Sequence, residues 1–202
     1  MVLILSRMLF VSFSLNCLLL ATASLAQEAA YNPTDARGEY EDHVLSDGQL
    51  TGEELAAVVK RAQEDLKSLL NTSISKVKQD LEADGVFSPQ AWMLMKDGEI
   101  KKLRLGSEAQ AAPSDIQVLM YRASLKSVAR HGEIHSALIA YPGSIKKDGR
   151  KEKIAVIEHE HRLGVAGLKL IPVKMVNGIV QFGAAIPQEK KFAFFYDDGA
   201  VR

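Results

Sequence analysis

The sequence predicts an α+β fold, a mostly antiparallel sheet of five to six strands packed by two helices. In residues 55–81 apolar side chains recur at three- and four-residue spacing, which indicates an amphipathic helix. Asp-Gly or Asn-Gly pairs lie between short runs of strand-forming residues, where hairpin turns are expected. A second helical pattern divides the strands into two groups. The expected order is therefore helix, two strands, helix, then three or four strands.

The first helix is expected to begin at Thr51 and to end at Gly85. Thr51 and Glu54 match a capping box. In this motif the threonine hydroxyl accepts from the backbone N–H of the glutamate, and the glutamate side chain accepts from the backbone N–H of the threonine. A glycine just after the last apolar position is typical of a left-handed helix end. A break near residues 71–73 is the alternative to one continuous helix.

The second helix is expected from Ser114 to about Arg130, with Gly132 as its left-handed cap. Its spacing predicts a buried stripe made of Ile116, Leu119, Met120, Ala123 and Ser127. Strands are expected at residues 90–96, 99–105, 135–145, 154–162, 168–176 and 179–186, with residues 192–196 as an optional last short strand.

The amino-terminal segment predicts export. Residues 1–26 have one positive charge at Arg7, an apolar run and small residues before Ala26, the form of a cleavable signal peptide. The chain is then expected to contain an acidic flexible arm (27–49), a single α+β domain (50–196) and a tail (197–202), with no stable membrane span after cleavage. The only cysteine lies inside the predicted leader, so a cysteine-free mature domain in the periplasm, or secreted, is expected.

Charge is distributed unevenly along the chain. Residues 27–85 carry 13 acidic and 6 basic side chains, whereas residues 86–202 carry 12 acidic and 18 basic ones. No lysine or arginine block is long enough to indicate nucleic-acid binding. The cationic carboxy-terminal part favours an acidic protein or an anionic envelope component as the partner.

The order of elements resembles the profilin-like and roadblock-like layouts, in which helices pack a central antiparallel sheet. Short motifs also resemble a family of small uncharacterised bacterial exported domains over roughly residues 55–186. These motifs are Phe87-x-Pro89, Asp97-Gly98-Glu99, Ile157-Glu158-His159 and Phe182-Gly183. The resemblance implies no known activity.

The densest group of titratable side chains, residues 158–162, is the main candidate for a functional site. Alternate residues of a strand share a face, so His159 and His161 are candidate zinc ligands, with His135, or else His131, as a third. Glu158, Glu160 and Arg162 are expected on the opposite face, as an exposed, ion-paired strand end.

No nucleophile elbow, phosphate-binding loop or helical metalloprotease motif occurs in the sequence. Trp92, the only tryptophan, is expected either in the core or at an apolar ligand pocket. The favoured interpretation is a non-catalytic binding domain that uses Trp92, Glu158, Glu160 and Arg162 and needs no cofactor. The alternatives are a metal-dependent hydrolase built on the two strand histidines, and an inhibitor or immunity-type partner of a secreted enzyme.

Overall fold

The computed structural model of this chain describes residues 49–196. The predicted leader, the tail and all of the predicted arm except its last residue, Gln49, lie outside this range, so those boundaries stay predictions. The helices are α2 (Gly52–Asp84), α3 (Ser107–Gln110) and α4 (Ser114–Arg130), and the strands are β1 (Gln90–Met95), β2 (Ile100–Leu103), β3 (Ile134–Lys147), β4 (Arg150–His161), β5 (Val165–Val176), β6 (Ile179–Phe182) and β7 (Ile186–Gln188). None of the helices in this range is both long enough and apolar enough to span a bilayer.

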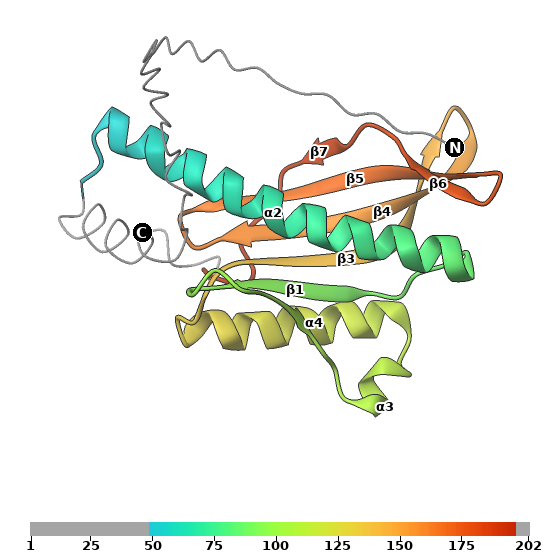
Figure 1. The fold of residues 1–202 in the computed structure, drawn as a ribbon, viewed down its shortest axis with the longest axis horizontal. Coiled ribbons are helices and arrows are strands. Elements are labelled where there is room, and N and C mark those ends of the chain that lie inside the picture. Colours follow the sequence, from blue (N-terminus) through green and yellow to red (C-terminus); the bar gives the residue numbers. More distant parts are fainter. Residues whose placement is uncertain (1–48, 197–202) are drawn as a thin grey trace, which may run out of the picture. The chain divides into compact units, whose positions relative to one another are not determined.

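The strands form one antiparallel sheet in the order β2-β1-β3-β4-β5-β6, and β7 pairs with β5 beside β6. The α+β class is thus confirmed, with one strand more than the five to six expected. A first cluster of buried side chains packs α2 against the sheet, and a second packs α4 against the opposite face of β1 and β3. The sheet therefore lies between α2 on one face and α4 on the other (Figure 1).

Helix α2 follows its sequence pattern closely. Both hydrogen bonds of the predicted Thr51–Glu54 capping box are present, and Gly85 ends the helix with φ +71°. The helix is continuous through residues 71–73, so the alternative of a break there is wrong. The hydroxyls of Thr72 and Ser73 donate to carbonyls of the preceding turn. Its buried stripe covers the sheet from β1 to β6.

Helix α4 has the predicted bounds but buries a different stripe. The buried residues are Gln117, Val118, Tyr121 and Leu125, whereas Ile116, Leu119 and Met120 are exposed. The expected stripe is therefore wrong. Two stripes on this helix have similar spacing. Tyr121 packs against the sheet, and the Gln117 amide donates to the carbonyls of Gln110, at the end of α3, and of Ala112.

The predicted glycine turns are confirmed. Gly98, Gly149 and Gly178 follow β1, β3 and β5 with φ of +85°, +74° and +79°. Asp148 and Asn177 also have positive φ, 49° and 52°, which is the backbone of a two-residue hairpin turn.

Two strand predictions near the carboxy terminus are wrong. The single strand expected at residues 179–186 is interrupted at Gly183, giving β6 and β7, which pair with different parts of β5. Residues 192–196 are not a strand, because the N–H groups of Ala193, Phe194 and Phe195 all donate to the side chain of Glu160. A side chain thus takes the donors that a neighbouring strand would otherwise use.

Candidate functional site

The charged cluster at residues 158–162 lies at the end of β4, a central strand paired on both sides by β3 and β5. As predicted, Glu158 and Glu160 lie on one face of the sheet, that of α4, and His159 and His161 lie on the other. The expected exposure is wrong, because Glu158, Glu160 and His161 are only 3%, 0% and 0% exposed. Helices on both faces and the segment after β7 cover this end of the strand, so its charges need partners within the protein.

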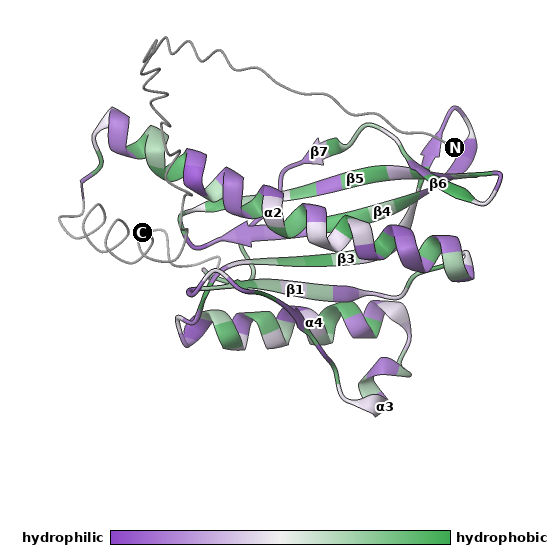
Figure 2. Cartoon of the chain, viewed as in Figure 1, coloured by the Kyte–Doolittle hydropathy of each residue, from purple (hydrophilic) through white to green (hydrophobic). Residues whose placement is uncertain are grey.

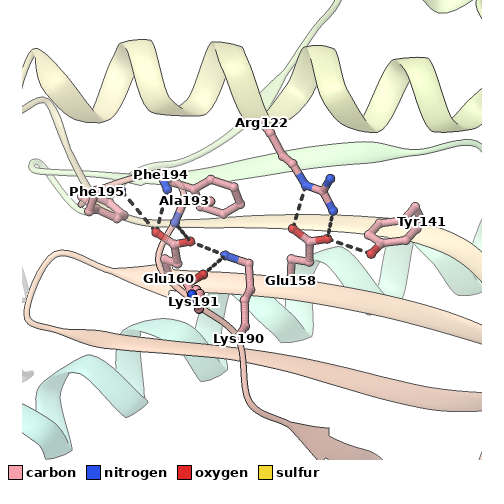
Figure 3. A network of polar contacts seen from close by, with 9 residues as sticks. All are labelled: Arg122, Tyr141, Glu158, Glu160, Lys190, Lys191, Ala193, Phe194 and Phe195. Atoms are coloured by element: carbon pink, nitrogen blue, oxygen red, sulfur yellow. Dashed lines mark hydrogen bonds and ion pairs between the residues drawn. The ribbon is translucent and has the colours of Figure 1, made fainter. Parts of the chain in front are cut away.

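Glu158 joins α4 to the sheet through Arg122 of α4 and Tyr141 of β3 (Figure 3). The Arg122 Nε donates to one carboxylate oxygen at 3.1 Å and its Nη2 donates to the other, which also accepts from the Tyr141 hydroxyl at 2.7 Å. Burial alone would raise the pKa of Glu158, but the guanidinium and the hydroxyl together hold this pKa below its usual value. Burial and then the carboxylate raise the pKa of Tyr141. Both carboxylate oxygens are therefore already engaged in an ionised, structural pair.

Glu160 holds the segment that follows β7 against the sheet (Figure 3). Its carboxylate accepts from the backbone N–H groups of Ala193, Phe194 and Phe195 at 2.7, 2.8 and 3.2 Å. The Lys190 ammonium pairs with the same carboxylate and lies 4.5 Å from the centre of the Phe194 ring. Phe194 is only 1% exposed and belongs to the core beside α4. Glu160 thus fixes the backbone of residues 193–195 against the end of β4.

On the α2 face, His161 forms a buried pair with Asp65 of α2, in which its Nε2 lies 3.1 Å from the Asp65 Oδ2. The backbone N–H of Leu163 donates to Nδ1 of the same ring at 3.0 Å, so the neutral ring carries its proton on Nε2 and donates to the aspartate. The His135 ring stacks on this imidazole with ring centres 6.3 Å apart. Both nitrogens of His161 therefore have partners within the protein.

His159 packs against Gly167 of β5, where an added Cβ would come within 2.9 Å of the ring. Burial, and next the Lys169 ammonium, lower the pKa of His159 to about 4. Among residues 49–196, no three or more His, Cys, Asp or Glu side chains are placed to hold a metal ion. The predicted zinc ligands His135, His159 and His161 are accordingly not brought together as one such group.

The two remaining predicted ligand-binding residues lie apart from each other. Trp92 of β1 is half-buried against the α2-side core, with the Lys102 Nζ 5.5 Å from its ring centre. Arg162 follows β4, and its backbone N–H donates to the His135 carbonyl at 2.9 Å. Its own carbonyl accepts from the Tyr196 hydroxyl. Trp92 thus lies on the α2 face of the sheet, whereas Glu158 and Glu160 lie on the α4 face.

A groove of about 600 Å³ lies at the other end of the sheet, beside the carboxy-terminal end of α2. It is lined by both apolar and polar side chains. The apolar lining includes Leu81, Val86, Phe87, Pro142, Ile154 and Val173, and the polar lining comprises Ser88, Ser114, Ser144, Lys151 and Lys153. Both lysines are exposed, and neither forms an ion pair with another residue of the described range. The groove thus combines an apolar lining with two available cations.

The sequence prediction missed this groove because its lining comes from five separate segments between residues 81 and 173. The only local indication is the alternation at the start of β4, where Lys151 and Lys153 share a face just before buried Ile154.

A second cleft of about 600 Å³ adjoins this groove and shares Ser114 and Pro142 with it. Its cation is Arg122, which Glu158 already neutralises, and Asp115 adds a negative charge to the lining. This cleft is therefore less suited than the groove to an anionic ligand.

Comparisons with protein-family models, with curated proteins and with solved structures each found no match. The resemblance to small bacterial exported domains stays a prediction, and the role of the groove is inferred from its own geometry.

Proposed function

We propose that this chain is an exported, non-catalytic binding domain that holds an anionic amphiphile in the groove beside α2. An anionic amphiphile has an apolar chain and an acidic group at one end. The observation that carries the proposal is the apolar lining of the groove together with Lys151 and Lys153, two exposed lysines that form no ion pair within residues 49–196. This ligand class includes anionic components of a bacterial envelope.

The dimensions and charges of the groove suit such a molecule. Its volume of about 600 Å³ lies within the range of about 300–1,000 Å³ that is usual for small-molecule sites. Contact with the lining removes apolar surface from water, which stabilises a complex by about 25 cal/mol per Å² before the costs of binding. Lys151 and Lys153 lie on one face of β4, two residues apart, so a single carboxylate or phosphate can contact both ammonium groups.

The state of the β4 carboxylates and of His161 supports binding over catalysis. Glu158, Glu160 and His161 would be the natural acids and bases of this chain, but their side chains are engaged by Arg122, by backbone N–H groups and by Asp65. A general acid or base must instead reach a substrate proton.

Export into the periplasm is supported by the leader pattern at residues 1–26. Mass spectrometry of the chain recovered from a periplasmic extract tests this part of the proposal. We expect Gln27 at the amino terminus, and recovery of the intact leader on cytoplasmic protein alone would contradict export.

Calorimetric titration with dodecanoate, below its micelle concentration, tests the groove. We expect saturable binding of dodecanoate and much weaker binding of dodecanol, which has the same chain without the charge. The double variant Lys151→Glu, Lys153→Glu should weaken binding at least about tenfold, which corresponds to about 1.4 kcal/mol. Val86→Ser removes apolar lining at a residue that is 64% exposed, and should weaken binding without unfolding the domain.

The matched control is Lys60→Glu, Lys67→Glu, which makes the same charge change at two exposed positions on the amino-terminal half of α2. This variant should bind dodecanoate like the wild type. Equal affinity for dodecanoate and dodecanol would refute a role for the groove lysines. An equal loss of dodecanoate affinity in both double variants would refute it as well.

A further inference from the structure

The tip of the β5–β6 hairpin exposes three large apolar side chains. Met175, Val176 and Ile179 are 46%, 42% and 58% exposed, on either side of the Asn177-Gly178 turn. Consecutive residues of a strand point to opposite sides, so Met175 and Val176 make both sides of this tip apolar. A partner that covers one side only would leave the other in water.

The neighbouring β3–β4 hairpin is strongly basic at its tip. Five exposed basic side chains lie here against two acidic ones, Asp148 and Glu152. The basic residues are Lys146, Lys147, Arg150, Lys151 and Lys153. None of the five forms an ion pair within residues 49–196, so their charge is available to an external partner.

The two tips extend from the same end of the sheet (Figure 1). Strands β4 and β5 pair only as far as Ile154 and Pro172, and beyond these residues each hairpin continues as a separate two-stranded ribbon. Figure 2 shows the apolar β5–β6 tip and the hydrophilic β3–β4 tip at this end, where α2 also ends. Four residues of β5 beyond Pro172 span roughly 13 Å at the usual rise of a strand.

We infer that this end of the sheet docks onto an anionic lipid bilayer, with the β5–β6 tip in the interfacial region and the basic hairpin against the headgroups. Insertion covers both sides of the apolar tip, and the ribbon exceeds the depth of about 5–10 Å to which apolar faces are buried at such an interface. Anionic headgroups complement the five basic side chains of the β3–β4 hairpin, which form no ion pair with other residues of the described range. Three residues on a narrow projecting tip form a small patch compared with the roughly 800 Å² per partner of a stable protein interface.

Docking in this orientation would place the groove at the bilayer surface, since Lys151 and Lys153 belong to both the groove and the basic hairpin. This consequence rests on the proposed function, because it makes the bilayer the source of the amphiphile. The docking itself depends only on the two tips, so the two proposals can fail separately.

Co-sedimentation with lipid vesicles tests the docking. The protein used is the chain as it is recovered from the cell that expresses it. One set of vesicles is pure phosphatidylcholine and the other contains about one quarter phosphatidylglycerol. We expect at least about tenfold stronger partitioning onto the anionic vesicles, lost at high salt as screening increases. Met175→Ser, Ile179→Ser and, separately, Lys146→Glu, Lys147→Glu should each reduce partitioning by about tenfold or more, while both still bind dodecanoate in solution.

Leu119→Ser, Met120→Ser is the matched apolar control, since these residues are similarly exposed on α4, 55% and 39%. This variant should sediment like the wild type. Equal partitioning onto neutral and anionic vesicles, or unchanged partitioning of the Met175→Ser, Ile179→Ser variant, would overturn the inference. Salt-sensitive retention on carboxylated beads without vesicle binding would also overturn it, and would favour an acidic protein surface.

Discussion

The two ends of β4 differ in how their charges are used. At the carboxy-terminal end, Glu158, Glu160 and His161 are buried, and each has specific partners. At the amino-terminal end, Lys151 and Lys153 are exposed beside a groove and form no ion pair in the described part of the chain. The charges that hold this fold together are thus separate from the charges that a ligand can reach.

This contrast shows why a dense group of titratable residues is a poor guide to function. Buried charges are costly unless they are paired, so a protein that buries a carboxylate also positions its donors. Substitutions at the two ends of β4 should therefore have opposite consequences, for stability at one end and for binding at the other.

The largest effect on stability is expected at Glu160. Glu160→Ala removes the acceptor of three backbone N–H groups and leaves the Lys190 ammonium unpaired, so the free energy of unfolding should fall by about 3–5 kcal/mol. Urea denaturation measures the change. Glu189→Ala, at a nearby exposed position, should change it by less than about 0.5 kcal/mol. Similar losses in both variants would show that the carboxylate does not hold the segment after β7.

The next effect is a loss of stability with falling pH caused by His159. Its pKa of about 4 in the folded protein lies below the ordinary value of 6.5, so the unfolded chain binds this proton first. The contribution of the neutral His159 ring to the free energy of unfolding is complete above pH 6.5. It is lost as the pH falls towards 4, and the total loss is up to about 3 kcal/mol. His159→Gln should flatten the stability curve across this interval. In NMR titrations the His159 ring should remain neutral at pH 5, and a midpoint near 6.5 would contradict the assignment.

The smallest effect on stability is expected at the groove. Lys151→Glu, Lys153→Glu changes two exposed side chains that have no ion pair in the part of the chain that the structure describes, so the free energy of unfolding should change by less than about 0.5 kcal/mol. Urea denaturation of this variant complements its titration with dodecanoate. A loss above about 1 kcal/mol would mean that the lysines support the hairpin, and would remove the contrast between the two ends.

Much of the fold was predictable because its determinants act over a few residues. The Thr51 cap, the Gly85 helix end and the Asn177-Gly178 turn each depend on neighbours in the chain, and all three are present as predicted. The buried face of α4 was not predictable, because two stripes have similar spacing and only contact with the sheet selects Tyr121 and Leu125 over Leu119.

The candidate site was predictable only in part. Strand alternation correctly separated Glu158 and Glu160 from the two histidines, since it is a property of the local backbone. The partners of these residues could not be predicted. Asp65 lies 96 positions from His161, and Phe194 lies 34 positions after Glu160.

The sequence by itself determined the order of the two long helices and of the strands as far as β5, together with the helix ends and the hairpin turns, because apolar spacing, capping residues and positive φ are local properties of the chain. Only the tertiary structure decided which charges are buried with partners and which line a groove. Burial and pairing depend on residues far apart in the sequence, and they come together only when α2, α4 and the final segment pack on the sheet.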